Sequence, residues 1–219
     1  MKSIIFKNIP LSERVFQALK DRIISGEYPP NTVLSEKEIC EEFGVSRTPF
    51  RESIKKLDEL KLINVVPRFG TYVSEIDIHE IRNAFEVRMN IEGFTCELAA
   101  VRQTPEELDR LANLTERLDH LLQSEDFSEG SKIDKEFHTV IRDAAHNTIL
   151  KEMTERLHSI CERAFSSSYR KKMSISEFVS DWKGIYGAIE NRDASLANRL
   201  MSKHIQHAFD RFKSEIDMG

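Results

Sequence analysis

Apolar residues recur at helical spacing from the start of the chain. Within residues 11–25, Val15, Leu19 and Ile23 lie at steps of four, which is the apolar stripe of an amphipathic helix. A glycine and a pair of prolines follow soon afterwards and end that helix. The pattern therefore predicts a first helix with one face in a core.

Two more helices are predicted on either side of a tight turn. Ser35 and Glu38 form a capping box, so a short helix should begin there and run to about Phe43. Gly44 supplies the turn, and Ser46 is expected to cap the next helix. A proline in the first turn of that helix is tolerated, because the N–H groups there have no partner within the helix.

The third helix has two faces of different character. Its apolar residues lie at steps of four and three and predict a buried face: Phe50, Ile54 and Leu57. Arg47, Arg51 and Lys55 lie at steps of four on another face and should point outward. Residues 62–66 and 71–73 are then rich in β-branched side chains and predict a hairpin with a turn between them. This order is typical of a winged helix-turn-helix, whose second helix enters the major groove of DNA.

The rest of the chain predicts helices alone, beginning with a cap at Thr104 and a proline after it. The expected helices span 78–102, 105–123, 129–146, 148–167, 175–191 and 194–215. The predicted fold is mainly α. A winged helix-turn-helix of three helices and a hairpin occupies residues 1–75, and an all-α bundle of six to seven helices occupies residues 76–219.

Composition narrows the class of protein. Of the 219 residues 40% are apolar, which is enough for globular cores, and no apolar run approaches the roughly 20 residues of a membrane-spanning helix. The first ten residues are too short in apolar length for a signal peptide. The odd number and wide spacing of the cysteines, Cys40, Cys96 and Cys161, favour a reducing cytoplasm over a disulfide framework.

The net charge of −5 is unevenly distributed. Residues 1–75 carry 12 Lys and Arg against 11 Asp and Glu, a net +1, which leaves −6 for the remainder. DNA binding needs a local basic face, whereas the overall charge mainly tunes non-specific attraction. The acidic second part is therefore expected to stay off the DNA.

Candidate DNA contacts gather at the start of the third helix. Arg47 and Arg51 lie one turn apart there, and arginine paired with guanine is the commonest base contact in the major groove. Ser46 and Thr48, with the free N–H groups beside them, suit a phosphate. For the neighbouring lysines 55, 56 and 61, a solvated surface charge is as good an interpretation as a phosphate contact.

The segment LSEKEICEEFGVSRTPFRESIKKLDELKLI…RFGTYV closely resembles the N-terminal domain of the GntR family of transcriptional regulators, over residues 11–74. In that family VSR-T-P-x-R-E is the signature of the recognition helix. The resemblance implies DNA contacts by Lys37, Arg47 and Arg51, and by the wing from Arg68 to Gly70. The family often has arginine where Lys37 stands, and lysine lacks the bidentate geometry of a guanidinium.

Histidine and aspartate spacing suggests a second site. Asp134 and His138 lie four apart on one helical face and together can bind a divalent metal, although a solvated pair explains the same spacing. His204 and His207 are equally ambiguous. The remaining histidines have no companion at ligand spacing and are interpreted as structural or exposed: His79, His120, His146 and His158.

Residues 78–215 resemble the all-helical effector domain of the FadR-type branch of that family. The resemblance rests on Arg88-x3-Glu92, Asp134-x2-Phe137-His138 and the closing segment that ends at His204-Ile205. Many members bind a metal through one aspartate and three histidines, which implies Asp134, His138 and His204 as ligands here. The fourth position holds Trp182, whose indole is only a hydrogen-bond donor.

Two interpretations of this difference remain open. Three ligands with waters or an effector carboxylate hold a divalent metal such as Zn or Ni, or the Trp182 ring fills the metal's place in a metal-free cavity. Arg88 is the candidate anchor for an anionic effector, with Trp182 beside it; the alternative for Arg88 is an ion pair with Glu86, Glu92 or Asp134. The branch responds to carboxylic acids, sugar acids or amino-acid derivatives.

These features predict a cytoplasmic transcriptional regulator, a repressor and not an enzyme. Two chains are expected to read a palindromic double-stranded operator as a homodimer, with no membrane association. A metal sensor, in which the ion is the signal, is one alternative. A metal-dependent hydrolase or lyase using Asp134, His138 and His204 is another, although no general base or oxyanion group is evident beside them.

Overall fold

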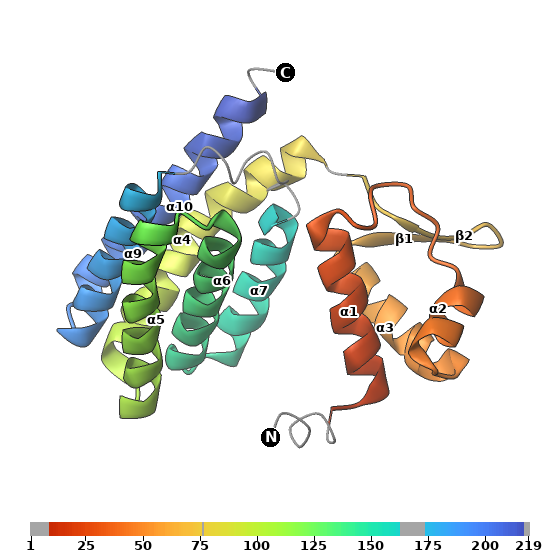
Figure 1. The fold of residues 1–219 in the computed structure, drawn as a ribbon, viewed down its shortest axis with the longest axis horizontal. Coiled ribbons are helices and arrows are strands. Elements are labelled where there is room, and N and C mark those ends of the chain that lie inside the picture. The colour runs from red at the N-terminus through yellow and green to blue at the C-terminus, as the bar shows by residue number, and fades with distance from the viewer. Residues whose placement is uncertain (1–8, 76, 163–173, 217–219) are drawn as a thin grey trace. The chain divides into compact units, whose positions relative to one another are not determined.

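The computed structural model describes residues 9–75, 77–162 and 174–216, and these form two compact units (Figure 1). The first unit ends at Ile78 and the second begins at His79. Of the described helices, none is both long enough and apolar enough to cross a membrane.

The first unit contains three helices and a hairpin, as the sequence predicts. The elements are α1 (Leu11–Ser25), α2 (Glu36–Phe43), α3 (Arg47–Glu59), β1 (Ile63–Val66) and β2 (Gly70–Val73). The two strands pair antiparallel, with Ile63 opposite Val73 and Val66 opposite Gly70. The fold class predicted for this part, a winged helix-turn-helix, is confirmed (Figure 1).

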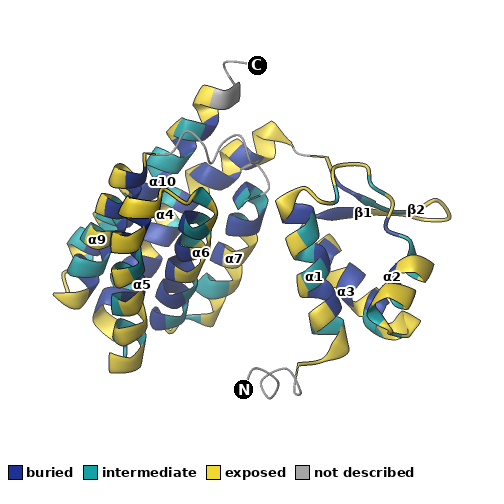
Figure 2. Ribbon diagram, in the orientation of Figure 1, coloured by how far each residue is buried: buried dark blue, intermediate teal, exposed yellow. Residues whose placement is uncertain are grey.

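One apolar core holds these elements together. The buried faces predicted for the first and third helices point into it (Figure 2), and its members come from α1, α2, α3 and the hairpin: Val15, Phe16, Leu19, Ile23, Leu34, Ile39, Phe50, Ile54, Leu57, Leu62, Ile63 and Val73. The arginine face of α3 is left outside this core, because a helix with one apolar stripe buries only that side.

The turn between α2 and α3 is built by its local chemistry, with one difference from expectation. The Ser35 hydroxyl accepts a hydrogen bond from the Glu38 N–H at 3.4 Å, and Gly44 ends α2 in the left-handed conformation at φ 61°. Ser46 stands at the N-cap position of α3, but its side chain makes no capping hydrogen bond. The expected cap by Ser46 is therefore wrong, and its hydroxyl remains on the exposed start of the helix.

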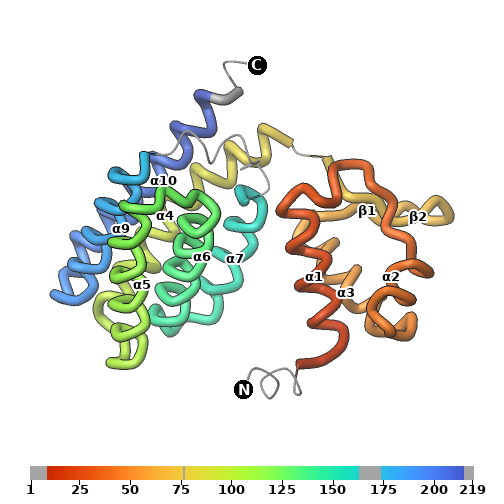
Figure 3. Tube along the Cα trace, in the orientation of Figure 1, coloured from red at the N-terminus to blue at the C-terminus, as the bar shows by residue number. Residues whose placement is uncertain are grey.

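The second unit is all helical in its described part (Figure 3). Its helices are α4 (Ile78–Arg102), α5 (Pro105–Ser124), α6 (Phe127–Ala144), α7 (Thr148–Glu162), α9 (Ile175–Glu190) and α10 (Ala194–Ile216). The helix predicted over residues 129–146 corresponds to α6, and its predicted bounds are two residues too late at both ends. The helix begins at Phe127 because the Asp126 carboxylate accepts hydrogen bonds from two N–H groups of its first turn. The helix predicted over residues 148–167 corresponds to α7, and the part predicted beyond residue 162 lies outside the described residues.

The start of α5 is the capping box that the sequence predicts. Thr104 Oγ1 accepts from the Glu107 N–H at 3.3 Å, and Glu107 Oε2 accepts from the Thr104 N–H at 2.9 Å. Two N–H groups of a helix end are satisfied in this way, which fixes the turn between α4 and α5.

The packing of α4 against α10 depends on a glycine. A Cβ on Gly93 would overlap Ser202 Oγ and lie 3.1 Å from the Asn198 carbonyl oxygen. Ser202 cannot easily turn away, because its hydroxyl donates to the Met89 carbonyl across the same contact at 2.7 Å. The absence of a side chain on Gly93 lets the two helices approach closely.

Gly93→Ala should therefore destabilise the protein by about 1–3 kcal/mol, because the added methyl group overpacks the contact between α4 and α10. The measurement is the free energy of unfolding in urea. Gly187→Ala on α9 is the matched control, since a Cβ there meets nothing within 4 Å. That variant should be stabilised by about 0.5–1 kcal/mol through helix propensity. Equal effects of the two substitutions would contradict this account of Gly93.

Candidate functional site

The three metal-ligand candidates of the sequence meet inside the second unit. Asp134 and His138 lie on α6 and His204 on α10, and one ligand atom from each lies within 4.8 Å of the others. His204 Nε2 is 3.4 Å from Asp134 Oδ1, and His138 Nε2 is 3.9 Å from Asp134 Oδ2. Both histidines are buried, whereas Asp134 is partly exposed.

Trp182 on α9 is part of the same group. Its ring is fully buried, and its centroid lies 4.5 Å from the His204 ring and 5.0 Å from the His138 ring. It stacks on Phe137 at 4.4 Å, and its Nε1–H donates to Asp134 Oδ1 at 3.1 Å. The indole thus contacts the carboxylate from the position where the resemblance implies a fourth ligand.

Glu92 on α4 orients His138 from the other side. His138 Nδ1 lies 2.7 Å from Glu92 Oε2, and Nε2 on the other side of the ring faces Asp134. A carboxylate bound to the far nitrogen of a histidine is the usual way in which a metal-ligating imidazole is oriented.

Arg88 forms a buried ion pair with Glu92, one turn further along α4. Arg88 Nε donates to Glu92 Oε1 at 2.5 Å, and Nη2 lies 3.3 Å from His158 Nδ1. Burial alone would raise the pKa of Glu92, but the charge of Arg88 and the hydrogen bond with His138 hold it well below its usual range. The alternative interpretation of Arg88, an ion pair within the bundle, is therefore observed with Glu92. Its proposed contact with an effector remains a prediction.

His204 lies between two carboxylates. Its Nε2 faces Asp134, and its Nδ1 lies 3.5 Å from Asp181 Oδ2 on α9. Burial opposes protonation, but Asp134 and Asp181 together raise the pKa of His204. His207 also contacts Asp181, at 2.9 Å from Nδ1 to Oδ2.

Sequence reasoning missed three members of this cluster. His158, interpreted as structural or exposed, is buried on α7 with its ring 5.1 Å from that of His138. Glu92 entered as part of a family motif and as one of three alternative partners of Arg88, and Asp181 was not considered. The contacts of these three residues with His138 and His204 run between helices, so spacing within one helix does not indicate them. The other three histidines that were set aside, at positions 79, 120 and 146, are exposed.

The donor set fits a divalent metal with three protein ligands. It offers one carboxylate and two imidazoles on converging helices, which is the mixture of O and N donors that Zn or Ni accepts. The Trp182 N–H occupies one lone pair of Asp134 Oδ1 and leaves Oδ2 for a metal. Asp134, His138 and His204 are the residues that would hold the ion.

The DNA-reading candidates form an exposed face on the first unit. Arg47 and Arg51 are both largely exposed, and their Nε atoms lie 3.0 and 3.4 Å from the Glu36 carboxylate on α2. Exposed ion pairs of this kind are weak, so the arginines are available to a stronger partner. Ser46, Thr48 and Lys37 are also exposed, on the same two helices.

The lysines beside this face have partners of their own. Lys56 Nζ lies 2.6 Å from Glu13 on α1, and Lys55 Nζ lies 3.9 Å from Glu59. These exposed pairs are weak, as those of the arginines are, so both interpretations of the two lysines stay open.

The wing carries its basic residue at its tip. Arg68 has φ 68°, and Gly70 has φ 131°, a backbone conformation in which other residues are strained. Phe69 between them is 77% exposed. An arginine and a glycine, which has no side chain, therefore lie at the end of the hairpin. An approach to the minor groove would require such an arrangement.

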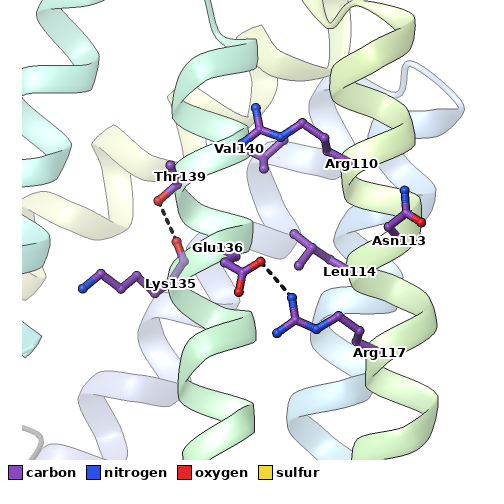
Figure 4. A pocket seen from close by; sticks show the side chains of 8 residues that line it. All are labelled: Arg110, Asn113, Leu114, Arg117, Lys135, Glu136, Thr139 and Val140. Atoms are coloured by element: carbon purple, nitrogen blue, oxygen red, sulfur yellow. Dashed lines mark hydrogen bonds and ion pairs between the residues drawn. The ribbon is translucent and has the colours of Figure 1, made fainter. Parts of the chain in front are cut away.

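A cleft of about 420 Å³ lies between α5 and α6, on the side of α6 away from the metal-ligand candidates. Figure 4 shows its wall: Arg110, Asn113, Leu114, Arg117, Lys135, Glu136, Thr139 and Val140. The Arg117 guanidinium there is already paired with Glu136 at 2.8 Å and Glu129 at 2.6 Å. The cleft contains none of the predicted site residues.

Glu92→Gln should cost about 3–5 kcal/mol of unfolding free energy, because it leaves the Arg88 guanidinium buried without its counter-charge. The effect should depend on pH. Since the folded-state pKa of Glu92 lies below its ordinary value of 4.5, its contribution is present above that pH and is lost as the pH falls through the folded-state value. The difference in stability between wild type and variant should therefore shrink in acid.

Glu86→Gln is the matched control for this prediction. Glu86 pairs with Arg82 at the same i, i+4 spacing on the same helix, but both groups are exposed. That substitution should change the unfolding free energy by less than about 1 kcal/mol at any pH. A comparable loss in both variants would show that burial of the Arg88–Glu92 pair does not set its importance.

Comparison with known proteins gives consistent results for both units. Residues 83–207 match the FCD domain family, and residues 11–73 match the family described as bacterial regulatory proteins, gntR family. The chain is 26% identical over 197 residues to the HTH-type transcriptional repressor RspR of Escherichia coli strain K12, across 90% of this chain and 86% of that protein. It is 29% identical over 209 residues to the gluconate operon transcriptional repressor of Bacillus licheniformis, across 93% and 84%. The solved structure of E. coli McbR/YncC shares the fold, with a TM-score of 0.81 at 21% identity over 95% of this chain and 99% of that one.

Proposed function

The chain belongs to the GntR family of bacterial transcriptional regulators and carries an FCD domain as its second unit, and from this we propose that it is a cytoplasmic repressor controlled by a small carboxylate. The matched relatives are regulators, which sets aside the interpretation as a hydrolase or lyase. The observation that carries the proposal is that one chain has both an exposed arginine face on α3 and a buried, charged cluster in the helical unit.

We infer that the DNA partner is a double-stranded operator read by α3. Arg47 and Arg51 would contact base edges in the major groove, with Lys37, Ser46 and Thr48 on phosphates. The wing, with Arg68 and Gly70, would approach the neighbouring minor groove. These roles agree with the exposure of the residues, and each is open to mutation.

Arg51→Ala should cost about 1–3 kcal/mol of discrimination between an operator, selected from random duplexes with the wild type, and unrelated DNA of the same length. The measurement is fluorescence anisotropy at fixed salt. Lys55→Ala removes a neighbouring positive charge and is the control, for which the ratio of the two affinities should stay the same. Full discrimination by the Arg51 variant would remove that residue from base readout.

The proposed effector is a small organic acid bound in the helical unit. One of the relatives is named as a gluconate operon repressor, and gluconate is a sugar acid. Trp182 and Arg88 lie in the buried cluster where such a ligand would be held. The ligand would shift operator affinity by the ratio of its affinities for the DNA-binding and the non-binding states.

We further propose that Asp134, His138 and His204 bind one divalent metal such as Zn or Ni. The ion would supply a positive charge for an effector carboxylate. The bond from Trp182 to Asp134 supports the competing proposal of a metal-free cavity, so the two are separated by experiment.

Titration of chelator-treated protein with Ni²⁺ should quench the fluorescence of Trp182, the single tryptophan of the chain, in a saturable way. His138→Ala removes one imidazole and should abolish the quenching, whereas His120→Ala, on the exposed surface of α5, should not. Quenching that is absent, or identical in wild type and the His138 variant, would favour the metal-free cavity. Operator binding that responds to the metal alone would instead favour a metal sensor.

The proposed homodimer has a candidate contact surface on α4. Val87, Phe94 and Val101 are exposed at steps of seven, with the partly buried Ile91 and Leu98 between them. This is the a and d spacing with which helices pair. A second copy on this face would join two DNA-binding units in one assembly, as a palindromic operator requires.

A further inference from the structure

A buried arginine on α6 has no role in the cluster described above. Arg142 lies one turn beyond His138 and is only 6% exposed. Its Nη2 donates to Thr139 Oγ1 at 3.3 Å, but Nε and Nη1 are buried without any hydrogen-bond partner among the described residues. A guanidinium carries five N–H donors and no acceptor, so these nitrogens need an acceptor that the described chain does not supply.

The carboxylates near Arg142 either bind other groups or make no hydrogen bond to its guanidinium. Glu92 lies near enough for its charge to act on Arg142, but its two oxygens already serve Arg88 and His138. Glu155 and Asp143 are further acidic neighbours, and neither makes a hydrogen bond to the guanidinium. Burial is the largest influence on Arg142 and lowers its pKa, with the nearby charge of Arg88 acting in the same direction.

Arg142 therefore differs from Arg88 in the property that matters for ligand binding. Arg88 is as deeply buried, but its charge is matched by Glu92. A buried cation without a matched counter-charge is costly, and it becomes favourable when an anion with suitable geometry completes it. A planar carboxylate suits a guanidinium, because its two oxygens accept from two N–H groups at once.

We propose that Arg142 is the residue that binds the carboxylate of the effector. The inference rests on the proposed function and deepens it, because it moves the anchor from Arg88 to a residue that sequence reasoning did not consider. A singly charged carboxylate fits better than a phosphate, since Glu92 nearby would repel a second negative charge. The anion would then be held by the same helix that carries Asp134 and His138, one turn beyond His138.

Acetate is the probe that tests this anchor, because it presents a carboxylate with almost nothing else. The temperature of the unfolding midpoint is followed as sodium acetate is added to the full-length protein, with sodium chloride and uncharged acetamide in parallel. Wild type should show a saturable rise with acetate and none with acetamide, since a ligand that binds only the folded state stabilises it.

Arg142→Met keeps an unbranched, flexible side chain and removes the guanidinium with its charge. This variant should lose the acetate response, with an apparent affinity weaker by about tenfold or more, as expected for a charged hydrogen bond. Without acetate it should unfold at the same temperature as wild type or higher, because the unmatched buried charge is gone. A merely structural arginine would instead give a clear loss of stability at every acetate concentration.

Arg156→Met on α7 is the control, since it removes the same charge from an exposed position and should respond to acetate as wild type does. An acetate response that is absent in wild type, or unchanged in Arg142→Met, overturns the proposal. Operator binding by wild type is measured separately. If wild type binds the operator but shows no acetate response, only the role of Arg142 as anchor is refuted. If the acetate response depends on Arg142 but the protein binds no DNA, only the proposed function is refuted.

Discussion

The Glu92 carboxylate is the group on which the helical unit depends most. One of its oxygens neutralises the buried Arg88, and the other contacts His138 Nδ1. The other ring nitrogen of His138 then faces Asp134, next to His204. Without this one negative charge, a buried cation would be exposed to an apolar interior and the candidate metal ligand would lose its orientation. Packing, stability and site geometry are therefore linked through a single side chain.

The charge pattern of the cluster explains how it can bind a ligand and still be stable. Arg88 and Glu92 match each other, and His204 lies between two carboxylates that raise its pKa. Arg142 differs, because two of its nitrogens find no acceptor in the described chain and no carboxylate is bonded to it. A buried polar group without a partner calls for an explanation, and the proposed carboxylate supplies one. Trp182 adds an apolar wall and a single N–H, which limits the space beside Asp134.

Sequence reasoning succeeded where the physical signal is local. The capping box at Thr104, the turn at Gly44 and the apolar stripe of α3 each depend on residues a few positions apart, and the structure contains all three. The α6 face that carries Asp134 and His138 was found for the same reason, since i and i+4 share a side of a helix. The cap expected from Ser46 failed because position alone does not decide whether a hydroxyl turns toward the helix end.

The sequence by itself determined the fold class, the exposed arginine face of α3, and the family to which the chain belongs. Only the tertiary structure decided that the Arg88–Glu92 pair is buried, that His158 lies beside His138, and that Arg142 is buried without a matched acceptor. The reason is physical. Periodicity records which side of a helix is buried, whereas ion pairing and desolvation depend on which helices pack together, and these come from distant parts of the chain.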